Sequence, residues 1–425
     1  MGFQQGLSGL NASAKNLDVI GHNIANSNTT GFKSSRTEFA AMVASAVGTA
    51  GGINSGIGVE VGAIAQQFNQ GNLTVTGNSL DVAINGNGFF TLQMPDGSRG
   101  YTRDGSFKLD TFGNVVTNSG AKVMGYPTDP DTGVRTSSTA SPLTFPTSAP
   151  IPAKQTTKIS AAFNLDARAP DAAGNPAATP PVPATPRSTY GTSINVYDSQ
   201  GVAKPVNLYF EKNGANTWDV YTELDDPNAV PPVVATPIGQ ITFDNSGNII
   251  GPAATPPATG FTLPLSITPT PPNPNGLPPY NVEISLDGVT QFGTKFAVSE
   301  LTQDGYTSGQ LTGINIGDDG VILTRYSNGV TRAEGQVVLA SFRNTQGLAA
   351  MGGNTWVETY ESGQPTFGAP TDGNFGSLRA GALEDSNVDL TAELVNMMTA
   401  QRAYQANAQT IKTQDQVMST LVNLR

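Results

Sequence analysis

The sequence predicts an α+β protein, mainly β, with paired helices at its two ends and two β-rich domains between them. Apolar residues recur at steps of four and three residues near both ends of the chain. Between the ends, apolar and polar residues alternate around Asn-Gly and Asp-Gly turns. Prolines concentrate in the middle, where residues 127–279 hold 27 of the 30. This nested order favours an elongated molecule whose outer β domain is inserted into the inner one.

The first helix is expected near the N-terminus. Its apolar positions follow the spacing of a coiled coil. They are Phe3, Leu7, Leu10, Leu17 and Ile24, with small residues between them. The simpler alternative is an amphipathic helix that packs only on its own domain.

The second helix is expected after residues 384–387, EDSN. Ser386 or Asn387 suits the N-cap position, and Asp389 and Glu393 favour a helix N-terminus. The apolar stripe and its neighbours include Leu390, Leu394, Met398, Tyr404, Ile411, Met418 and Leu421. Because this stripe is broad, we expect the helix to contact more than one partner.

The strand-and-turn pattern is expected to begin at about residue 72. LDVAINGNGFFTLQM predicts a hairpin, and GINIGDDGVILTRYSNGVT predicts another beyond residue 302. SINVYD, PVNLYFEKNGANTWDVYTEL and QITFDNSGNII predict strands within the proline-rich part, so this part is a second β domain with stiff connections. The expected domains are a terminal helical domain (1–71 and 379–425), an inner β domain (72–145 and 301–378) and an outer β domain (146–300).

The segment HNIANSNTTGFKSSRTEF, residues 22–39, interrupts the first apolar stripe; we call it the joint segment. Its Asn and Gly residues are suited to ending the helix and turning the chain, and its two Phe residues offer apolar anchors beyond the turn. These residues are Asn23, Asn26, Asn28, Gly31, Phe32 and Phe39. Either the segment is an ordinary helix-ending loop, or it redirects the chain toward the β domains and contacts neighbouring copies.

Composition argues against several classes of function. The net charge of −11 argues against nucleic acid or an anionic membrane as the main partner. There is no Cys, and His22 is the only His, so a catalytic triad or a multi-His metal site is not expected. Turn geometry accounts for GINSGIGVEVG, which lacks dinucleotide-binding and P-loop spacing. No cofactor, metal or enzyme activity is expected.

No cleavable secretion leader and no membrane-spanning apolar run is visible. A protein with this sequence that works outside the cytoplasm is therefore expected to use an export route that does not cleave a leader.

Several stretches resemble one protein family. ANSNTTGFKSSRTEF, LDVAINGNGFF and YTRDGSFKLDTFGNVVTNSGAKVMGY are similar to the N-terminal signature and following β segment of flagellar rod and hook proteins. TQDGYTSGQL, GNFGSLRAGALE and the segment from Gly381 to Arg425 are similar to the family's C-terminal part. The resemblance covers roughly residues 1–126 and 302–425, and the large extra β domain favours the hook members.

The resemblance implies a structural subunit that polymerises helically into a curved hollow tube, a universal joint that transmits motor torque from rod to filament in swimming. It implies paired helices lining the channel, other copies of the chain as the main partner, a rod protein at the proximal end and a hook–filament junction protein at the distal end. It further implies a hook cap and the flagellar type III export apparatus as partners during assembly, with an extracellular location. Two alternatives are another flagellar axial role, in the distal rod or the junction, and a secreted β-rich adhesin with a helical oligomerisation stalk.

Overall fold

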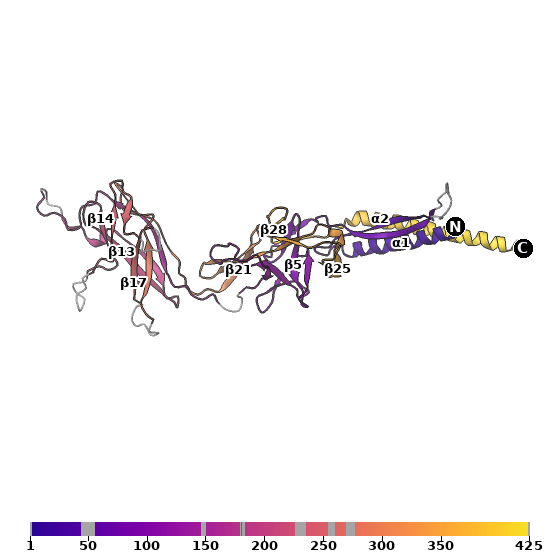
Figure 1. The fold of residues 1–425 in the computed structure, drawn as a ribbon, viewed down its shortest axis with the longest axis horizontal. Coiled ribbons are helices and arrows are strands. Elements are labelled where there is room, and N and C mark those ends of the chain that lie inside the picture. Colours follow the sequence, from indigo (N-terminus) through magenta and orange to yellow (C-terminus); the bar gives the residue numbers. More distant parts are fainter. Residues whose placement is uncertain are drawn as a thin grey trace. The chain divides into compact units, whose positions relative to one another are not determined.

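The computed structural model describes residues 2–43, 56–145, 150–178, 180, 183–225, 235–253, 260–268 and 277–423. The chain forms two compact units (Figure 1). Unit 1 comprises residues 1–148, 312–325 and 331–425, and unit 2 comprises residues 149–311 and 326–330.

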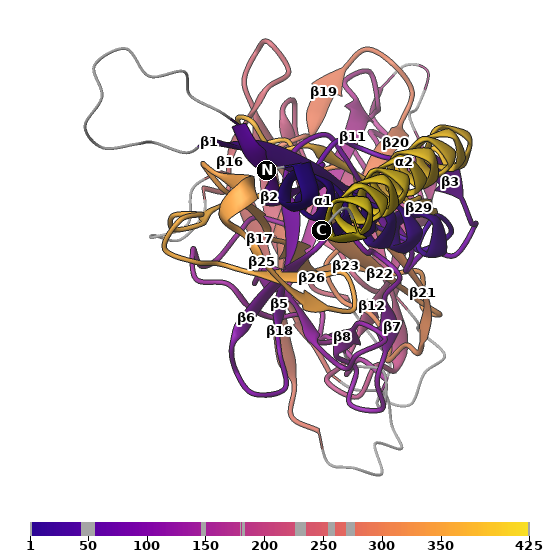
Figure 2. The ribbon, with the colours of Figure 1, turned by 90° about the vertical axis from the view of Figure 1, so that its right-hand side faces the viewer.

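Two helices at the chain ends, α1 (Gly2–Ala25) and α2 (Leu390–Asn423), run side by side in unit 1 (Figures 1 and 2). Together with the β structure of both units, their pairing confirms the expected mainly β fold with paired terminal helices. Helix α2 is capped by Asp389, whose Oδ1 accepts hydrogen bonds from the backbone N–H groups of Thr391 (2.9 Å) and Ala392 (3.1 Å). The expected cap at Ser386 or Asn387 is therefore wrong: the helix begins two or three residues later.

A long antiparallel hairpin, β1 (Ser35–Val43) and β2 (Gly56–Gln66), packs along α1. Gln5 Nε2 donates to the Gly56 carbonyl (2.6 Å), and the Val59 N–H donates to Ser8 Oγ (3.3 Å). The expectation that strands begin only near residue 72 is wrong. So is the assignment of GINSGIGVEVG to turns alone, because β2 includes its last seven residues. Glycine admits such close contact with α1: a Cβ on Gly58 would overlap the Ser8 side chain.

The rest of unit 1 is β structure around a core that includes Phe90, Val123 and Leu339. Among the described residues, thirteen strands form one sheet with the main order β21-β22-β23-β9-β5-β6-β26-β25, and two strand pairs, β28 with β4 and β29 with β3, connect the segment before α2 to the segment after β2. The strands are β3 (Leu73–Val75), β4 (Val82–Asn85), β5 (Phe89–Gln93), β6 (Arg99–Thr102), β7 (Lys108–Leu109), β8 (Val115–Val116), β9 (Lys122–Tyr126), β10 (Ser141–Pro142), β21 (Leu311–Ile316), β22 (Val321–Tyr326), β23 (Thr331–Val337), β24 (Leu339–Ser341), β25 (Ala349–Gly352), β26 (Thr355–Val357), β27 (Thr366–Gly368), β28 (Ser377–Ala380) and β29 (Ala382–Glu384), with a short 3₁₀ helix at Thr345–Gly347.

Unit 2 contains two five-stranded sheets that share one core. Its strands are β11 (Lys158–Asp166), β12 (Gly191–Tyr197), β13 (Ala203–Lys212), β14 (Thr217–Tyr221), β15 (Gly239–Phe243), β16 (Ile249–Gly251), β17 (Thr262–Ile267), β18 (Tyr280–Ser285), β19 (Thr290–Phe292) and β20 (Ala297–Gln303), with a 3₁₀ helix at Arg187–Thr189. Trp218 is fully buried in this core, and its Nε1 donates to Gln291 Oε1 (3.2 Å). The strands expected within the proline-rich part are confirmed as β12 to β16.

Candidate interaction site

Both helices leave large apolar side chains exposed, most of them on α2. Helix α1 exposes Phe3 by 50% and Leu7 by 43%, and α2 exposes Leu390, Leu394, Met398 and Met418 by 46–61%. Leu10, Leu17, Ile24 and Ile411 are half-buried, and Tyr404 is 37% exposed. Leu421 lies in α2, but its side chain is outside the described ones. Contiguous exposed apolar surface of this kind marks an interaction site.

Small residues at the contact between α1 and α2 explain why the large apolar side chains of the helices stay exposed. The close contact between the helices is made by Gly6 and Gly9 of α1, on which a Cβ would touch Ile411 and Asn407 of α2. Ala12 and Ala400 are buried at the same interface. Because these side chains are short, the helices pair closely through one narrow face, and the wider apolar faces of α2 have no covering in the described part of the chain.

Asn23 fixes the end of α1 to the start of β1. It is 1% exposed, its Nδ2 donates to the Ser35 carbonyl (2.8 Å) and its Oδ1 accepts from the Ser35 N–H (2.9 Å), so the side-chain amide pairs with the backbone as a neighbouring strand would. Its Nδ2 also lies 3.4 Å from Glu393 Oε1 on α2. Asn26 Nδ2 donates to the His22 carbonyl at the helix end (2.9 Å), whereas Asn28 is exposed.

Gly31 and Phe32 bring the joint segment onto the β structure of unit 1. Gly31 has φ +69°, its N–H donates to the Glu384 carbonyl (2.7 Å), and a Cβ there would lie 2.6 Å from the backbone N of Asp104. Phe32 is buried, and its ring centroid lies 5.5 Å from that of His22. Phe39, on β1, is half exposed.

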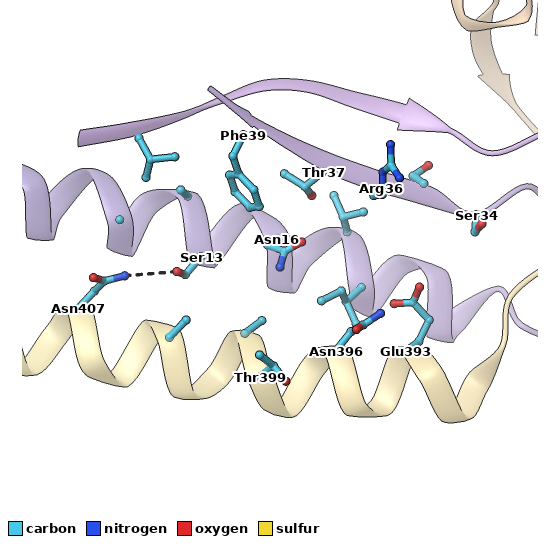
Figure 3. A pocket seen from close by; sticks show the side chains of 18 of the residues that line it. Ser13, Asn16, Ser34, Arg36, Thr37, Phe39, Glu393, Asn396, Thr399 and Asn407 are labelled. Carbon is cyan, nitrogen blue, oxygen red and sulfur yellow. Dashed lines mark hydrogen bonds between the residues drawn. The ribbon is translucent and has the colours of Figure 1, made fainter. Parts of the chain in front are cut away.

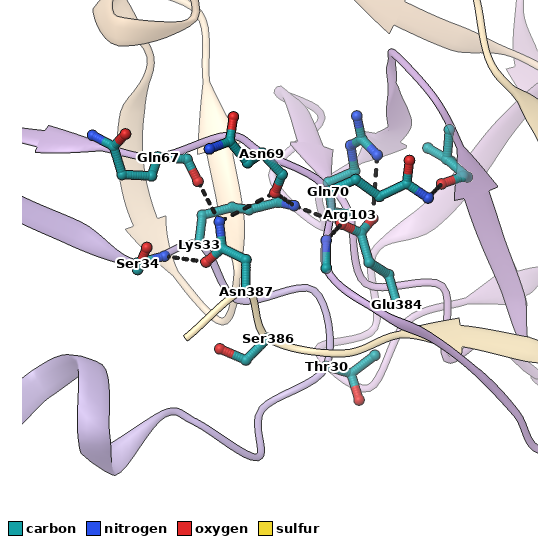
Figure 4. Close-up of polar contacts among 12 residues, drawn as sticks. Thr30, Lys33, Ser34, Gln67, Asn69, Gln70, Arg103, Glu384, Ser386 and Asn387 are labelled. Atoms are coloured by element: carbon teal, nitrogen blue, oxygen red, sulfur yellow. Dashed lines mark hydrogen bonds and ion pairs between the residues drawn. The ribbon is translucent and has the colours of Figure 1, made fainter. Parts of the chain in front are cut away.

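A buried ion cluster lies directly after this turn (Figure 4). Glu384, at the end of β29, is fully buried between Lys33 (Nζ to Oε1, 2.6 Å) and Arg103 (Nη1 to Oε2, 3.2 Å). Glu384 Oε1 also accepts from the Gly71 N–H (2.9 Å), and Lys33 Nζ donates to the Asn69 carbonyl (2.7 Å). Burial lowers the pKa of Lys33 and of Arg103, and the Glu384 carboxylate opposes both shifts. The cluster joins three distant parts of the sequence at one buried point.

Asn387 adds three hydrogen bonds next to the ion cluster. Its Oδ1 accepts from the Ser34 N–H (2.8 Å), and its Nδ2 donates to the carbonyls of Gln67 (2.7 Å) and Asn69 (3.1 Å) (Figure 4). Sequence reasoning missed the ion cluster and gave Asn387 a different role, because all these partners come from distant segments. The one available signal was an isolated Lys33 in an otherwise uncharged turn.

A groove of about 560 Å³ lies between α1, α2 and the hairpin (Figure 3). Glycine and alanine residues of both helices line part of it, Phe39 and Val59 add apolar surface, and Asn16, Asn396 and Thr399 add amide and hydroxyl groups. Two buried oxygens there, Thr37 Oγ1 and Glu393 Oε2, have no hydrogen-bond partner among the described residues. The groove is therefore lined by apolar, amide and hydroxyl groups, whereas these two oxygens lie beneath its surface.

The described residues contain no group of three or more His, Asp or Glu side chains placed to hold a metal ion. His22 contacts the Phe32 ring. Among the helices described, none combines the length and apolar character needed to cross a membrane.

Comparisons with known proteins match successive parts of the chain to flagellar families. The family described as "Flagella basal body rod protein" matches residues 3–33, and "Flagellar hook protein FlgE/F/G D1 domain" matches 83–162. "Flagellar basal body protein FlaE D2 domain" matches 164–306, and "Flagellar basal body rod FlgEFG protein C-terminal" matches 379–424.

Full-length relatives extend these matches. The chain is 44% identical to the flagellar hook protein FlgE of Escherichia coli and 42% identical to that of Salmonella typhimurium, and each alignment covers 100% of both chains. It is 32% identical to the hook protein of Treponema pallidum, over 99% of this chain and 98% of the relative. Among solved structures, the Helicobacter pylori flagellar hook protein FlgE2 matches with a TM-score of 0.53 and 17% identity, over 73% of this chain and 100% of the other. This last likeness concerns the fold.

Proposed function

Because this chain belongs to the flagellar hook protein family, we propose that its exposed helix faces and joint segment bind further copies of the same chain. The chain is a structural subunit of the bacterial flagellar hook and not an enzyme. In that role, copies polymerise helically into a curved hollow tube that acts as a universal joint between rod and filament.

The exposed apolar side chains of α2 support the proposal most directly. Leu394 and Met398 lie one turn apart, 46% and 52% exposed, on a helix whose pairing with α1 uses other positions. Burial of apolar surface yields roughly 25 cal/mol per Å², so repeated contacts of this kind stabilise an assembly strongly. We expect the other exposed residues of both predicted stripes to be covered in the same way.

The order of the chain supports an arrangement of domains within the tube. Residues 1–71 and 379–425 form the channel-lining terminal domain, residues 72–145 and 301–378 the middle layer, and residues 146–300 an outer domain inserted into the inner one. The close pairing of α1 and α2 through small side chains leaves larger apolar side chains exposed for contacts with other copies.

The remaining partners follow from the position of a hook subunit. A rod protein contacts the proximal end, a hook–filament junction protein contacts the distal end, and a cap acts at the growing tip. Export proceeds through the flagellar type III apparatus without cleavage of a leader, to an extracellular location. The absence of cysteine from the sequence suits a chain that travels unfolded, because no disulfide has to form afterwards.

Electron microscopy tests the proposed function. The purified full-length chain, concentrated until it polymerises, is expected to form curved hollow tubes. Discrete trimers would contradict the proposal and favour an adhesin with an oligomerisation stalk. Straight rods of fixed short length would favour a rod or junction role.

A further inference from the structure

The end of α2 continues past the start of α1. The two helices are antiparallel, since a Cβ on Gly6, near the start of α1, would touch Ile411, near the end of α2. Gly2, the first described residue of α1, is therefore level with about residue 415 of α2. Helix α2 continues for about two more turns (Figure 1). We call residues 416–423 the α2 extension.

The α2 extension has no support from the described part of the chain. Every residue from 415 to 420 is exposed, including Val417 by 50% and Met418 by 61%. A short stretch of helix is marginally stable in water unless tertiary contacts support it. Since the exposed side chains include large apolar ones, a protein surface outside the chain is expected to cover them.

The start of the same helix offers a matching apolar surface. Leu390, Leu394 and Met398 lie on successive turns of one face, and each is about half exposed. Met418 and Val422 of the extension repeat this four-residue spacing. Each copy therefore carries two apolar surfaces on α2, with centres about 36 Å apart along the helix.

The charges of α2 favour a parallel pairing of these two surfaces. In a parallel pair, Met418 of one copy can lie level with Leu394 of a second copy. Lys412 of the first copy then lies within about 2 Å of the level of Asp389 of the second. Both of these charged side chains are exposed, and their opposite charges attract. Asp415, the other charged residue between Lys412 and the end of the extension, is then level with an uncharged position.

Two extensions that pair with each other fit less well. In a parallel pair in register, Asp415 of one copy would lie beside Asp415 of the other, and like charges in contact oppose association. An antiparallel pair would use the same surface on both copies and would close as a dimer. Neither arrangement covers the exposed start of α2.

We propose that the α2 extension of one copy packs in parallel on the start of α2, residues 390–398, of the next copy. The proposal rests on the proposed function, because it names one contact of the polymer. The two surfaces lie at different places on the chain, so the contact is head-to-tail and repeats from copy to copy without closing. Each copy thereby supports the helical extension of its neighbour.

Cysteine cross-linking tests this pairing directly, because the chain has no cysteine of its own. Full-length copies carrying Met418→Cys, copies carrying Leu394→Cys and unmodified copies are mixed in equal parts, polymerised and oxidised. A disulfide between the two variants is expected, because level positions of paired helices bring the two sulfurs within reach. Mass spectrometry of the linked peptides identifies it.

The matched control for cross-linking uses another exposed position of α2. Gln405→Cys replaces Leu394→Cys in the same mixture, and Gln405 lies about 16 Å further along the helix. No disulfide with Met418→Cys is expected. Met418→Cys mixed with unmodified copies alone is likewise expected to remain unlinked.

The critical concentration for polymerisation, measured by sedimentation, gives a second test. Met418→Gln and Leu394→Gln are each expected to raise it about tenfold, since each replaces an apolar side chain that the contact buries. The double variant is expected to raise it about ten- to thirtyfold and not about a hundredfold, because both changes remove the same contact. Ile64→Thr, at a 52% exposed position of β2, is the control: its effect is expected to multiply with that of Met418→Gln.

The outcomes separate the contact from the proposed function. Tubes that form without a disulfide between Met418→Cys and Leu394→Cys would overturn this contact alone. A disulfide in Met418→Cys mixed only with unmodified copies would show that two extensions pair with each other, which also overturns it. Effects of Met418→Gln and Leu394→Gln that multiply in full would contradict a direct contact. Failure of the unmodified chain to form tubes would overturn the proposed function and this contact with it.

Discussion

Lys33 Nζ lies 2.6 Å from Glu384 Oε1, and both side chains are fully buried although 351 residues separate them in the sequence. The contact joins the joint segment to the strand that precedes α2. Arg103 lies on the other side of the same carboxylate. The Glu384 carboxylate is therefore the countercharge of two buried cations.

Glu384→Gln is expected to destabilise unit 1 by about 3–5 kcal/mol, because it leaves two buried cations without a countercharge. Urea denaturation of the full chain measures the effect. Glu38→Gln is the control: Glu38 pairs with Arg36 at the surface, their side chains are 47% and 67% exposed, and such pairs contribute about 0–1 kcal/mol. A similar small loss in both variants would contradict a structural role for the buried cluster.

Gly31→Val is expected to destabilise the joint segment by about 3 kcal/mol or more. The left-handed backbone and the overlap with the backbone of Asp104 both oppose a side chain there. Tube formation is expected to fail while calorimetry shows the β structure still folded. Gly120→Ala is the control, because Gly120 has φ +80° with no atom near its missing Cβ, and about 1 kcal/mol is expected. Normal tubes from Gly31→Val would contradict the assigned role.

The double variant Leu394→Gln with Met398→Gln is expected to abolish tube formation and to change monomer stability by less than about 1 kcal/mol. Both side chains are about half exposed, and Gln keeps a good helix propensity. Sedimentation and thermal denaturation measure the two effects. Gln405→Ser, an exposed polar position on the same helix, is expected to leave assembly intact. Unimpaired tubes from the double variant would exclude this face from the interface.

The terminal helices are expected to be disordered in dilute monomer and to become ordered on assembly, because large apolar side chains, most of them on α2, stay exposed until other copies cover them. Limited proteolysis followed by mass spectrometry should cut first within residues 2–25 and 390–423. Termini as resistant as the β strands would contradict this expectation.

Trp218→Phe is expected to destabilise unit 2 by about 1–3 kcal/mol, through lost packing and the lost hydrogen bond to Gln291. Since each unit has its own core, calorimetry should show one transition lowered and the other unchanged. A single transition that moves as a whole would show that the units unfold together.

The fold class could be predicted because each part carries a local signal. Spacings of four and three residues mark α1 and α2, and alternating residues around Asn-Gly turns mark strands such as β4 and β5. The β1–β2 hairpin was missed because its glycines and alanines resemble turn and helix composition. They suit a strand that packs closely along a helix, which only the tertiary contact reveals.

The site was predictable only in part, because most of its contacts join segments that are distant in the sequence. The positions of Asn23 and Gly31 near a helix end indicate a turn, but Asn23 pairs with Ser35 and Gly31 with Glu384. No sequence pattern links Lys33 to Glu384, because burial of an ion pair depends on how distant strands meet. Similarly, apolar spacing predicted which residues of α2 form stripes, but not that small residues elsewhere would make the contact with α1.

The amide groups of Asn23 and Asn387 make hydrogen bonds to the joint segment that depend little on the surrounding solution. Neither group titrates, and hydrogen bonds between neutral groups are hardly weakened by dissolved salt, whereas an exposed pair such as Arg36–Glu38 is screened within about 10 Å at 0.1 M ionic strength. The hydrogen bonds that Asn23 makes with Ser35 and Asn387 makes with Ser34 are therefore expected to change little with salt concentration or pH.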